Sequence, residues 1–196
     1  ESPNHPGGAL ALKTDPWTAA PGNATSLKWH SDGTTDYNYT RGNNVWAYQD
    51  RTDLNNPTIP KSTTSLTATV PLSFGFTPDF NQSTVINSPA RNKDFNVTNL
   101  FYWNNIIHDV MYQYGFDEPG GNFQANNQGR GGAGADYVLA EAQDASGSDN
   151  ANFATPADGG RPRMQMFLWN KATRPAFTIV NAPASIAGNI PSLESN

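Results

Sequence analysis

The chain has 196 residues, enough to bury a core, and its 12 Lys and Arg residues against 17 Asp and Glu residues give a formal charge of −5. This acidic balance, without any run of basic residues, argues against nucleic acids and anionic membranes as partners. The chain contains 0 Cys, which excludes a disulfide framework and a thiolate site, and no apolar run approaches the roughly 20 residues that span a bilayer.

The composition favours turns and short strands over helical bundles. Hydrophobic residues make up 36% of the chain, beside 17 Gly and 15 Pro. Residues 1 to about 65 should form a meandering region of strands and turns, held in place by Trp17, Trp29 and Trp46. Farther on, the alternation in TSLTATVPLSF predicts a strand that Pro71 ends or places at a sheet edge.

One segment, VTNLFYWNNIIHDVMYQYGF, carries a strong helical pattern. It predicts a helix over about 98–114, capped by Thr98 or Asn99 and closed by Gly115 in a left-handed conformation. Large apolar side chains recur in it every three or four residues, and we expect them to form its buried stripe. They are Leu100, Trp103, Ile107, Val110, Met111 and Tyr114.

The region after this helix predicts two further strands. The segment DYVLAEAQD has an apolar centre and is followed by the turn-rich DASGSDN. In RMQMFLWN, the apolar Met164, Met166 and Leu168 alternate with Gln165 and its neighbours, which is typical of an extended strand.

The stretch GRGGAG, residues 129–134, has the G-x-G-x-x-G spacing of dinucleotide-binding loops. That spacing binds a pyrophosphate only where a buried strand enters the loop and a helix leaves it. Upstream, GNFQANNQ is too polar for a central strand, and downstream the pattern favours a strand over a helix. We therefore interpret GRGGAG as a connecting loop.

The sequence has 3 His residues, and their spacing gives no zinc motif. His5, His30 and His108 are far apart, and no H-E-x-x-H string is present. His108 shares a helix face with Asn104, so a hydrogen-bonded structural role is favoured over a ligand or a catalytic base.

Nucleophile and carboxylate motifs are equally incomplete. No G-x-S-x-G elbow occurs. The carboxylate pairs Asp117 with Glu118 and Glu141 with Asp144 lie in turn-like surroundings, where solvated faces are more common than catalytic dyads. Taken alone, the residues give no complete active site.

A resemblance emerges from unusual strings that occur together and in order. The segment NLFYWNNIIHDVMYQYGFDEPGGNFQANNQGRGGAGADYVLAEAQD and the later SDNANFATPADGGRPRMQMFLW resemble the fungalysin family of secreted zinc metalloendopeptidases. The resemblance is dense from Leu100 to Trp169, and TDPW and WHSDGTTDYNYTRGNN extend it toward the start of the chain.

The resemblance implies a thermolysin-like catalytic domain whose zinc lies between a β-rich N-terminal lobe and a helical C-terminal lobe. Residues 1–170 correspond to the N-terminal lobe, an α+β unit that is mostly β and irregular with one long helix. Residues 171–196 form a connector that resembles the start of an inserted protease-associated domain. The family's zinc ligands and general base follow the matched region and are missing here. The chain alone is therefore expected to be inactive, with Zn2+ bound by a partner region, while Ca2+ binding stays open.

The resemblance also indicates where substrate would contact this lobe. In thermolysin-like enzymes an edge segment pairs with the peptide backbone, and Asn150, Ala151, Asn152 and Phe153 are its counterpart here. Asn150 and Ala151 would face the substrate, and the other two would shape the neighbouring pocket. An ordinary Asn-rich turn is the competing interpretation.

Two functional hypotheses follow from the sequence. In the first, the chain is the substrate-binding lobe of a secreted zinc endopeptidase and positions a peptide or protein substrate for a second lobe. In the second, it is a non-catalytic β-rich module that binds carbohydrate or a surface partner through exposed Trp and Asn side chains.

Overall fold

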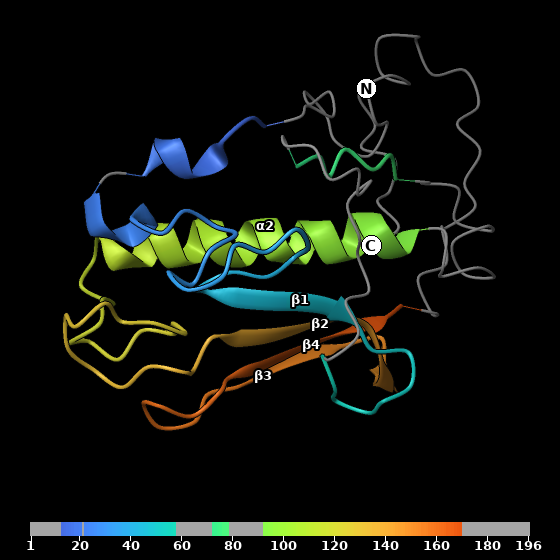
Figure 1. Ribbon diagram of the computed structural model, residues 1–196. Helices are drawn as coiled ribbons and strands as arrows, with labels where there is room; N and C mark the ends of the chain where they lie inside the picture. The colour runs from blue at the N-terminus through green and yellow to red at the C-terminus, as the bar shows by residue number, and fades with distance from the viewer. Residues whose placement is uncertain (1–12, 21, 58–71, 79–91, 170–196) are drawn as a thin grey trace, which may run out of the picture.

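The structure is a computed structural model that describes residues 13–20, 22–57, 72–78 and 92–169. Its elements in chain order are η1 (Pro16–Ala19), η2 (Gly22–Thr25), β1 (Val45–Gln49), α2 (Lys93–Tyr112), β2 (Val138–Ser148), β3 (Ala151–Ala154) and β4 (Arg163–Leu168). The helix α2 lies across one face of the sheet, in contact with β1 and β2 (Figure 1). One helix on a mixed sheet, joined by irregular chain, confirms the α+β fold class.

The four strands form one sheet in the order β1-β2-β4-β3. Strands β1 and β4 run parallel to β2, whereas β3 runs antiparallel to β4. At the β1 edge, the segment before β1 folds back and pairs with the strand. The Ala47 amide donates to the Thr40 carbonyl at 2.9 Å, and the Thr40 hydroxyl donates to the Ala47 carbonyl at 2.8 Å. At the opposite edge, no strand within the described ranges pairs with the outer side of β3.

The main core lies between α2 and the sheet. Its buried members come from both layers and from the segment before β1: Trp29, Val45, Ala47, Val97, Phe101, Val138, Ala140 and Ala142. A second cluster, with Trp46, Tyr48, Tyr137 and Leu139, covers the other sheet face, as the period of two along a strand requires. Trp29 and Trp46 are buried and Trp17 packs against the main core, which confirms their predicted anchoring role.

The predicted helix exists, but its bounds and its buried face were wrong. It begins at Lys93, after Asn92, and ends at Tyr112, so neither Thr98 nor Asn99 caps it. Gly115 does adopt a left-handed φ of 91°, three residues beyond the end. Of the expected stripe only Leu100 packs against the core, while the other five side chains are between 44% and 83% exposed: Trp103, Ile107, Val110, Met111 and Tyr114.

Polar side chains hold the buried face of α2, and this explains the error. That face comprises Val97, Phe101, Asn104, Asn105, His108 and Asp109. Asn44 donates to the Asn105 side chain at 3.0 Å, and the Trp29 indole donates to Asp109 at 2.9 Å. A buried polar group is tolerated when it is hydrogen-bonded, so periodicity of apolar residues alone could not identify the inner face.

The strands agree in part with the sequence. Strands β2 and β4 confirm the segments DYVLAEAQD and RMQMFLWN. The turn expected in DASGSDN was misplaced, because β2 continues to Ser148 through irregularities in its pairing with β4. Strand β1 was not identified as a strand from the sequence. The strand expected in TSLTATVPLSF lies largely outside the described residues, and 72–74 are not in a strand.

The glycine loop joins irregular chain to β2, so neither flank of a dinucleotide site is present. Two of its main-chain groups bond within the protein: the Gly131 carbonyl accepts from the Asn127 side chain at 2.8 Å, and the Ala133 amide donates to Asp158 at 2.8 Å. At Gly132, an added Cβ would lie 2.0 Å from the Glu118 carbonyl oxygen. Close backbone packing therefore explains the glycine.

The substitution Gly132→Ala should destabilise the fold by more than about 3 kcal/mol, because its methyl group would collide with backbone. Gly129→Ala is the matched control, since Gly129 also has a positive φ of 73° but meets nothing within 4 Å; its left-handed backbone should cost only about 1–2 kcal/mol. Urea unfolding of the two variants measures the difference. Equal losses would show that backbone conformation alone requires the glycine.

His30 is enclosed by aromatic rings near the N-terminal region of α2. Its ring stacks on Phe74 with centroids 5.1 Å apart and tilts against Phe101 at 4.7 Å. Its Nδ1–H donates to the Tyr39 carbonyl at 3.1 Å. Burial lowers the pKa of His30 to about 4, although the bond to Tyr39 works in the opposite direction. His30 is thus neutral and structural.

Because the pKa of His30 is lower in the folded state than its ordinary value of 6.5, its contribution to stability should be complete above pH 6.5 and decline as the pH falls toward 4. Its substitution by Asn keeps a donor near Nδ1 but removes the titration. The free energy of unfolding of the parent should therefore fall more steeply than that of His30→Asn between pH 6.5 and 4. Parallel profiles would contradict this assignment.

Candidate functional site

The predicted substrate segment lies at the edge of the sheet that no other described strand pairs with, which we call the open edge. Ala151, Asn152 and Phe153 belong to β3, and Asn150 immediately precedes it. All four residues are exposed. The chain reverses from β2 into β3 at Asp149, which adopts a left-handed φ of 55° and donates its amide to the Leu168 carbonyl at 2.9 Å.

The register determines which main-chain groups of β3 are free to bind. Ala151 lies opposite Met166 and Asn152 opposite Gln165, and the Phe167 amide donates to the Asn150 carbonyl at 3.2 Å. Hydrogen-bonded and non-bonded pairs alternate in an antiparallel ladder. Asn152 therefore directs its amide and carbonyl to β4, whereas Ala151 and Phe153 direct theirs away from the sheet.

Aromatic side chains lie close to Phe153 of β3. Phe153 is 42% exposed, and its ring centroid lies 6.2 Å from that of Phe123, which lies 5.3 Å from that of Phe116. Phe153 faces the same side of the sheet as its partner Met164, which packs against the main core. Asn152 projects to the opposite side because side chains alternate along a strand.

The histidines of the described region do not form a zinc site. His108 contacts Asp109 Oδ1 through Nδ1 and Gln124 Oε1 through Nε2, both at 3.0 Å. Both ring nitrogens are therefore engaged, as expected for a structural histidine. His30 is enclosed as described above, and His5 lies outside the described residues. The two histidines in the described part of the chain do not fit a catalytic zinc ion, which needs nitrogen or carboxylate ligands with an open coordination position.

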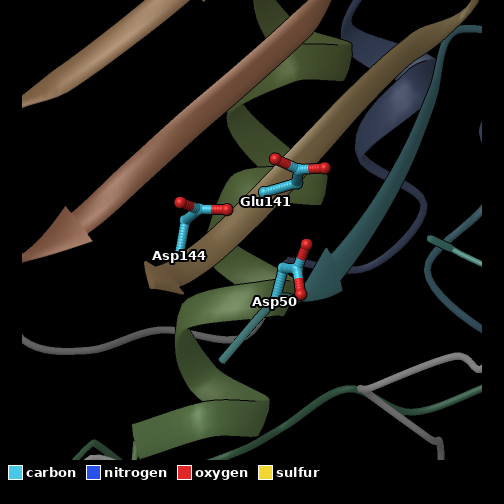
Figure 2. A group of neighbouring side chains, drawn as sticks. All are labelled: Asp50, Glu141 and Asp144. Atoms are coloured by element: carbon cyan, nitrogen blue, oxygen red, sulfur yellow. The ribbon is translucent and has the colours of Figure 1, made fainter. Parts of the chain in front are cut away.

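Three carboxylates from β2 and the end of β1 lie together instead (Figure 2). One oxygen from each of Asp50, Glu141 and Asp144 lies within 4.8 Å of the other two. All three residues are buried, with exposed fractions of 3% for Asp50 and 0% for the other two. The expectation that Glu141 and Asp144 form a solvated face was wrong, and the Glu118 side chain, 1% exposed, is buried as well.

A bulge in β2 brings Glu141 and Asp144 to one side of the sheet. Residues three apart in a regular strand face opposite sides. Here the pairing with β4 shifts between Ala142 and Asp144, and the intervening Gln143 has a positive φ of 52°. The extra residue reverses the alternation, and no signal in the sequence marked it.

Glu141 is the least well satisfied member of this carboxylate cluster. The Tyr48 hydroxyl and the Arg163 guanidinium both donate to its Oε1, but its buried Oε2 has no hydrogen-bond partner. Burial raises the pKa of Glu141 to about 6. The bond from Tyr48 and the charge of Arg163 act to lower it, whereas the charge of Asp144 and a side-chain contact with that residue act to raise it. Burial, followed by the bond to Glu141, raises the pKa of the Tyr48 hydroxyl as well.

The described helices give no membrane-spanning candidate, since none combines the length and the apolar character that a bilayer requires.

Comparison with known proteins finds a matching family model and similar curated proteins. The family model for fungalysin metallopeptidase (M36) matches residues 1–182. Extracellular metalloproteinase 3 of Arthroderma otae is 45% identical over 158 residues, which cover 81% of this chain and 23% of that protein. Extracellular metalloproteinase 2 of Trichophyton tonsurans is 42% identical over 168 residues, which cover 84% of this chain and 24% of that protein.

The chain thus spans about a quarter of the length of the curated relatives that it matches. The residues that the family model matches include the helix, the glycine loop and the edge strand described above. The chain belongs to the fungalysin metallopeptidase (M36) family.

Proposed function

We propose that this chain is the substrate-binding lobe of a secreted zinc-dependent endopeptidase. In this proposal β3 receives an extended peptide, and the zinc ligands and the general base come from polypeptide beyond this chain. The single observation that carries the proposal is the open edge of β3, whose Ala151 and Phe153 direct their main-chain groups outward. The family membership and the names of the relatives support the reaction class.

The geometry of β3 suits peptide recognition by strand addition. The carbonyls of an incoming strand can accept hydrogen bonds from the outward amides of Ala151 and Phe153, and its amides can donate to their outward carbonyls. Such main-chain bonds do not depend on the substrate sequence. The exposed Asn150 side chain offers one more donor and acceptor beside them. Phe153, with the neighbouring Phe123, provides apolar area on one side of the strand. This chain would therefore orient the substrate and leave the bond cleavage to the other lobe.

The exposed face of α2 supports a partner region within the protease. Five large apolar side chains lie on it, and the least exposed, Met111, is still 44% accessible. Such a patch on a soluble protein commonly marks an interface. We assign this face to the remaining part of the catalytic domain, because the relatives are about four times as long as the matched region.

The alternative, a binding module for carbohydrate or a surface partner, needs exposed indole rings. Trp29 and Trp46 are instead buried, at 2% and 8% exposure, and Trp17 is only partly exposed and packs against the core. The exposed Trp103 and Trp169 remain available for such a role. The geometry therefore favours the peptide-binding lobe.

The chain alone should be inert toward casein, because a bound zinc ion and a general base must come from elsewhere. Activity should appear when the chain is produced together with the region that follows it in the relatives, and a chelator should abolish that activity. Hydrolysis of labelled casein with each preparation measures this. Chelator-sensitive cleavage by the isolated chain, or tight glycan binding without any gain of hydrolysis on assembly, would contradict the proposal.

Replacement of the outward amide should impair substrate use without unfolding the sheet. In the assembled protease, Ala151→Pro should reduce kcat/KM at least about tenfold, because it removes a donor to the peptide but no bond to β4. Ala151→Ser keeps the amide and should retain kcat/KM. Asn152→Pro, which removes an inward amide, should instead lower the unfolding temperature. A parental kcat/KM in Ala151→Pro would show that substrate does not pair with this edge.

A further inference from the structure

The carboxylate cluster of Asp50, Glu141 and Asp144 carries more negative charge than its neighbours neutralise. Within the described residues, these three buried carboxylates include one ion pair, in which the Arg163 guanidinium donates to Glu141 Oε1. The sum is −2 when all three acids are ionised. Isolated buried charges are strongly unfavourable unless they are paired, protonated or bound to a metal.

Hydrogen bonds satisfy two of the three carboxylates. Asp50 accepts from the Leu54 amide at 3.2 Å and from the Asn55 amide at 2.6 Å. Asp144 accepts from the Ser146 amide at 2.8 Å and from the Gln165 side chain at 3.3 Å. These donors hold both side chains in fixed positions.

Glu141 lies beside both of them and keeps one oxygen without a hydrogen-bond partner. Its side chain is fully buried. Its Oε1 accepts hydrogen bonds from Tyr48 and Arg163, whereas its Oε2 has no hydrogen-bond partner. Figure 2 shows its carboxyl group beside those of Asp50 and Asp144. A buried oxygen without a partner is rare in native proteins and calls for a bound group or a proton.

We propose that Asp50, Glu141 and Asp144 bind a calcium ion that joins the end of β1 to the bulge of β2. The ligand atoms are all carboxylate oxygens, which hard cations such as Ca2+ prefer. Their separations, all within 4.8 Å, agree with two Ca–O bonds of 2.3–2.6 Å, which can hold oxygens up to about 5 Å apart. One divalent ion also balances the residual charge of −2.

This ion would act on the sheet and not on the cleaved bond. Asp50 is already tied to β2, since its amide donates to the Ala142 carbonyl at 3.2 Å and its carbonyl accepts from the Ala145 amide at 2.9 Å. Arg163 and Gln165 extend the contacts of the cluster to β4, the neighbour of the edge strand. Calcium would therefore stabilise the bulged region of β2 and the register between the strands.

Thermal unfolding of the full chain with CaCl2 and with chelator tests the proposal. At a calcium concentration about 100-fold above Kd, the melting temperature should rise by about 5–10 °C. Glu141→Gln is nearly isosteric and removes one ligand charge, so it should lose this rise. Asp53→Asn is the matched control: Asp53 is exposed, lies outside the cluster, and has a left-handed φ of 51° that Asn tolerates. It should keep the full rise.

Terbium luminescence gives a second measurement that does not depend on stability. Tb3+ bound at the cluster should be sensitised by Tyr48, whose hydroxyl bonds to Glu141, and excess calcium should quench the signal. Glu141→Gln should lose the signal and Asp53→Asn should keep it. Should Glu141→Gln fail to fold, Asp144→Asn carries the same comparison.

A shared proton in place of the ion would overturn the proposal, and its signature is different. The parent would then show no calcium-dependent rise. Its stability would decline as the pH increases from the ordinary glutamate pKa of 4.5 through the folded pKa of Glu141, about 6. Glu141→Gln would lack that decline. An equal calcium response in the parent and in Glu141→Gln would also overturn it, because the ion would then bind elsewhere.

Discussion

The described part of the chain depends on polar contacts between α2 and the layer beneath it. The Asn105 side chain accepts a hydrogen bond from Asn44, and Asp109 accepts one from the Trp29 indole. His108 contacts Gln124, and each of these distances is at most 3.0 Å. These groups are buried, so loss of one partner leaves the other without water or protein to bind, at a cost of about 1–3 kcal/mol. Such contacts are directional, and they fix the rotation and position of the helix more narrowly than apolar packing alone would.

Strand β2 connects the layer under α2 to both candidate sites, the edge strand β3 and the carboxylate cluster. Its apolar residues pack under α2, its bulge gathers the carboxylates, and its pairing with β4 positions β3 at the edge. Arg163 illustrates the connection, since it begins β4, lies opposite Ala154 of the edge strand and donates to Glu141. The geometry of the edge and the charge of the cluster are therefore linked through one strand, although the edge itself contains no acidic side chain.

The sequence predicted those elements whose signals are local. The three-and-four spacing identified α2, and the apolar centres of β2 and β4 identified those strands. The inner face of α2 was not predicted, because Trp103 and Ile107 belong to an apolar side of the helix that the described fold leaves exposed. The joint position of Glu141 and Asp144 escaped because a bulge depends on the pairing partner. The segment Asn150 to Phe153 came from family resemblance, and its edge position follows from a sheet order that no single stretch specifies.

The open edge of β3 has a consequence for the association of the protein with itself. A strand that can pair with any extended backbone can also pair with the same strand of a second molecule, the route by which exposed edges begin aggregation. The described edge strand is only 4 residues long, and Asp149 bends the chain away at its start. Shortness and curvature limit how many bonds two such edges can form, so the edge can be accessible to peptides without offering a long template for fibrils.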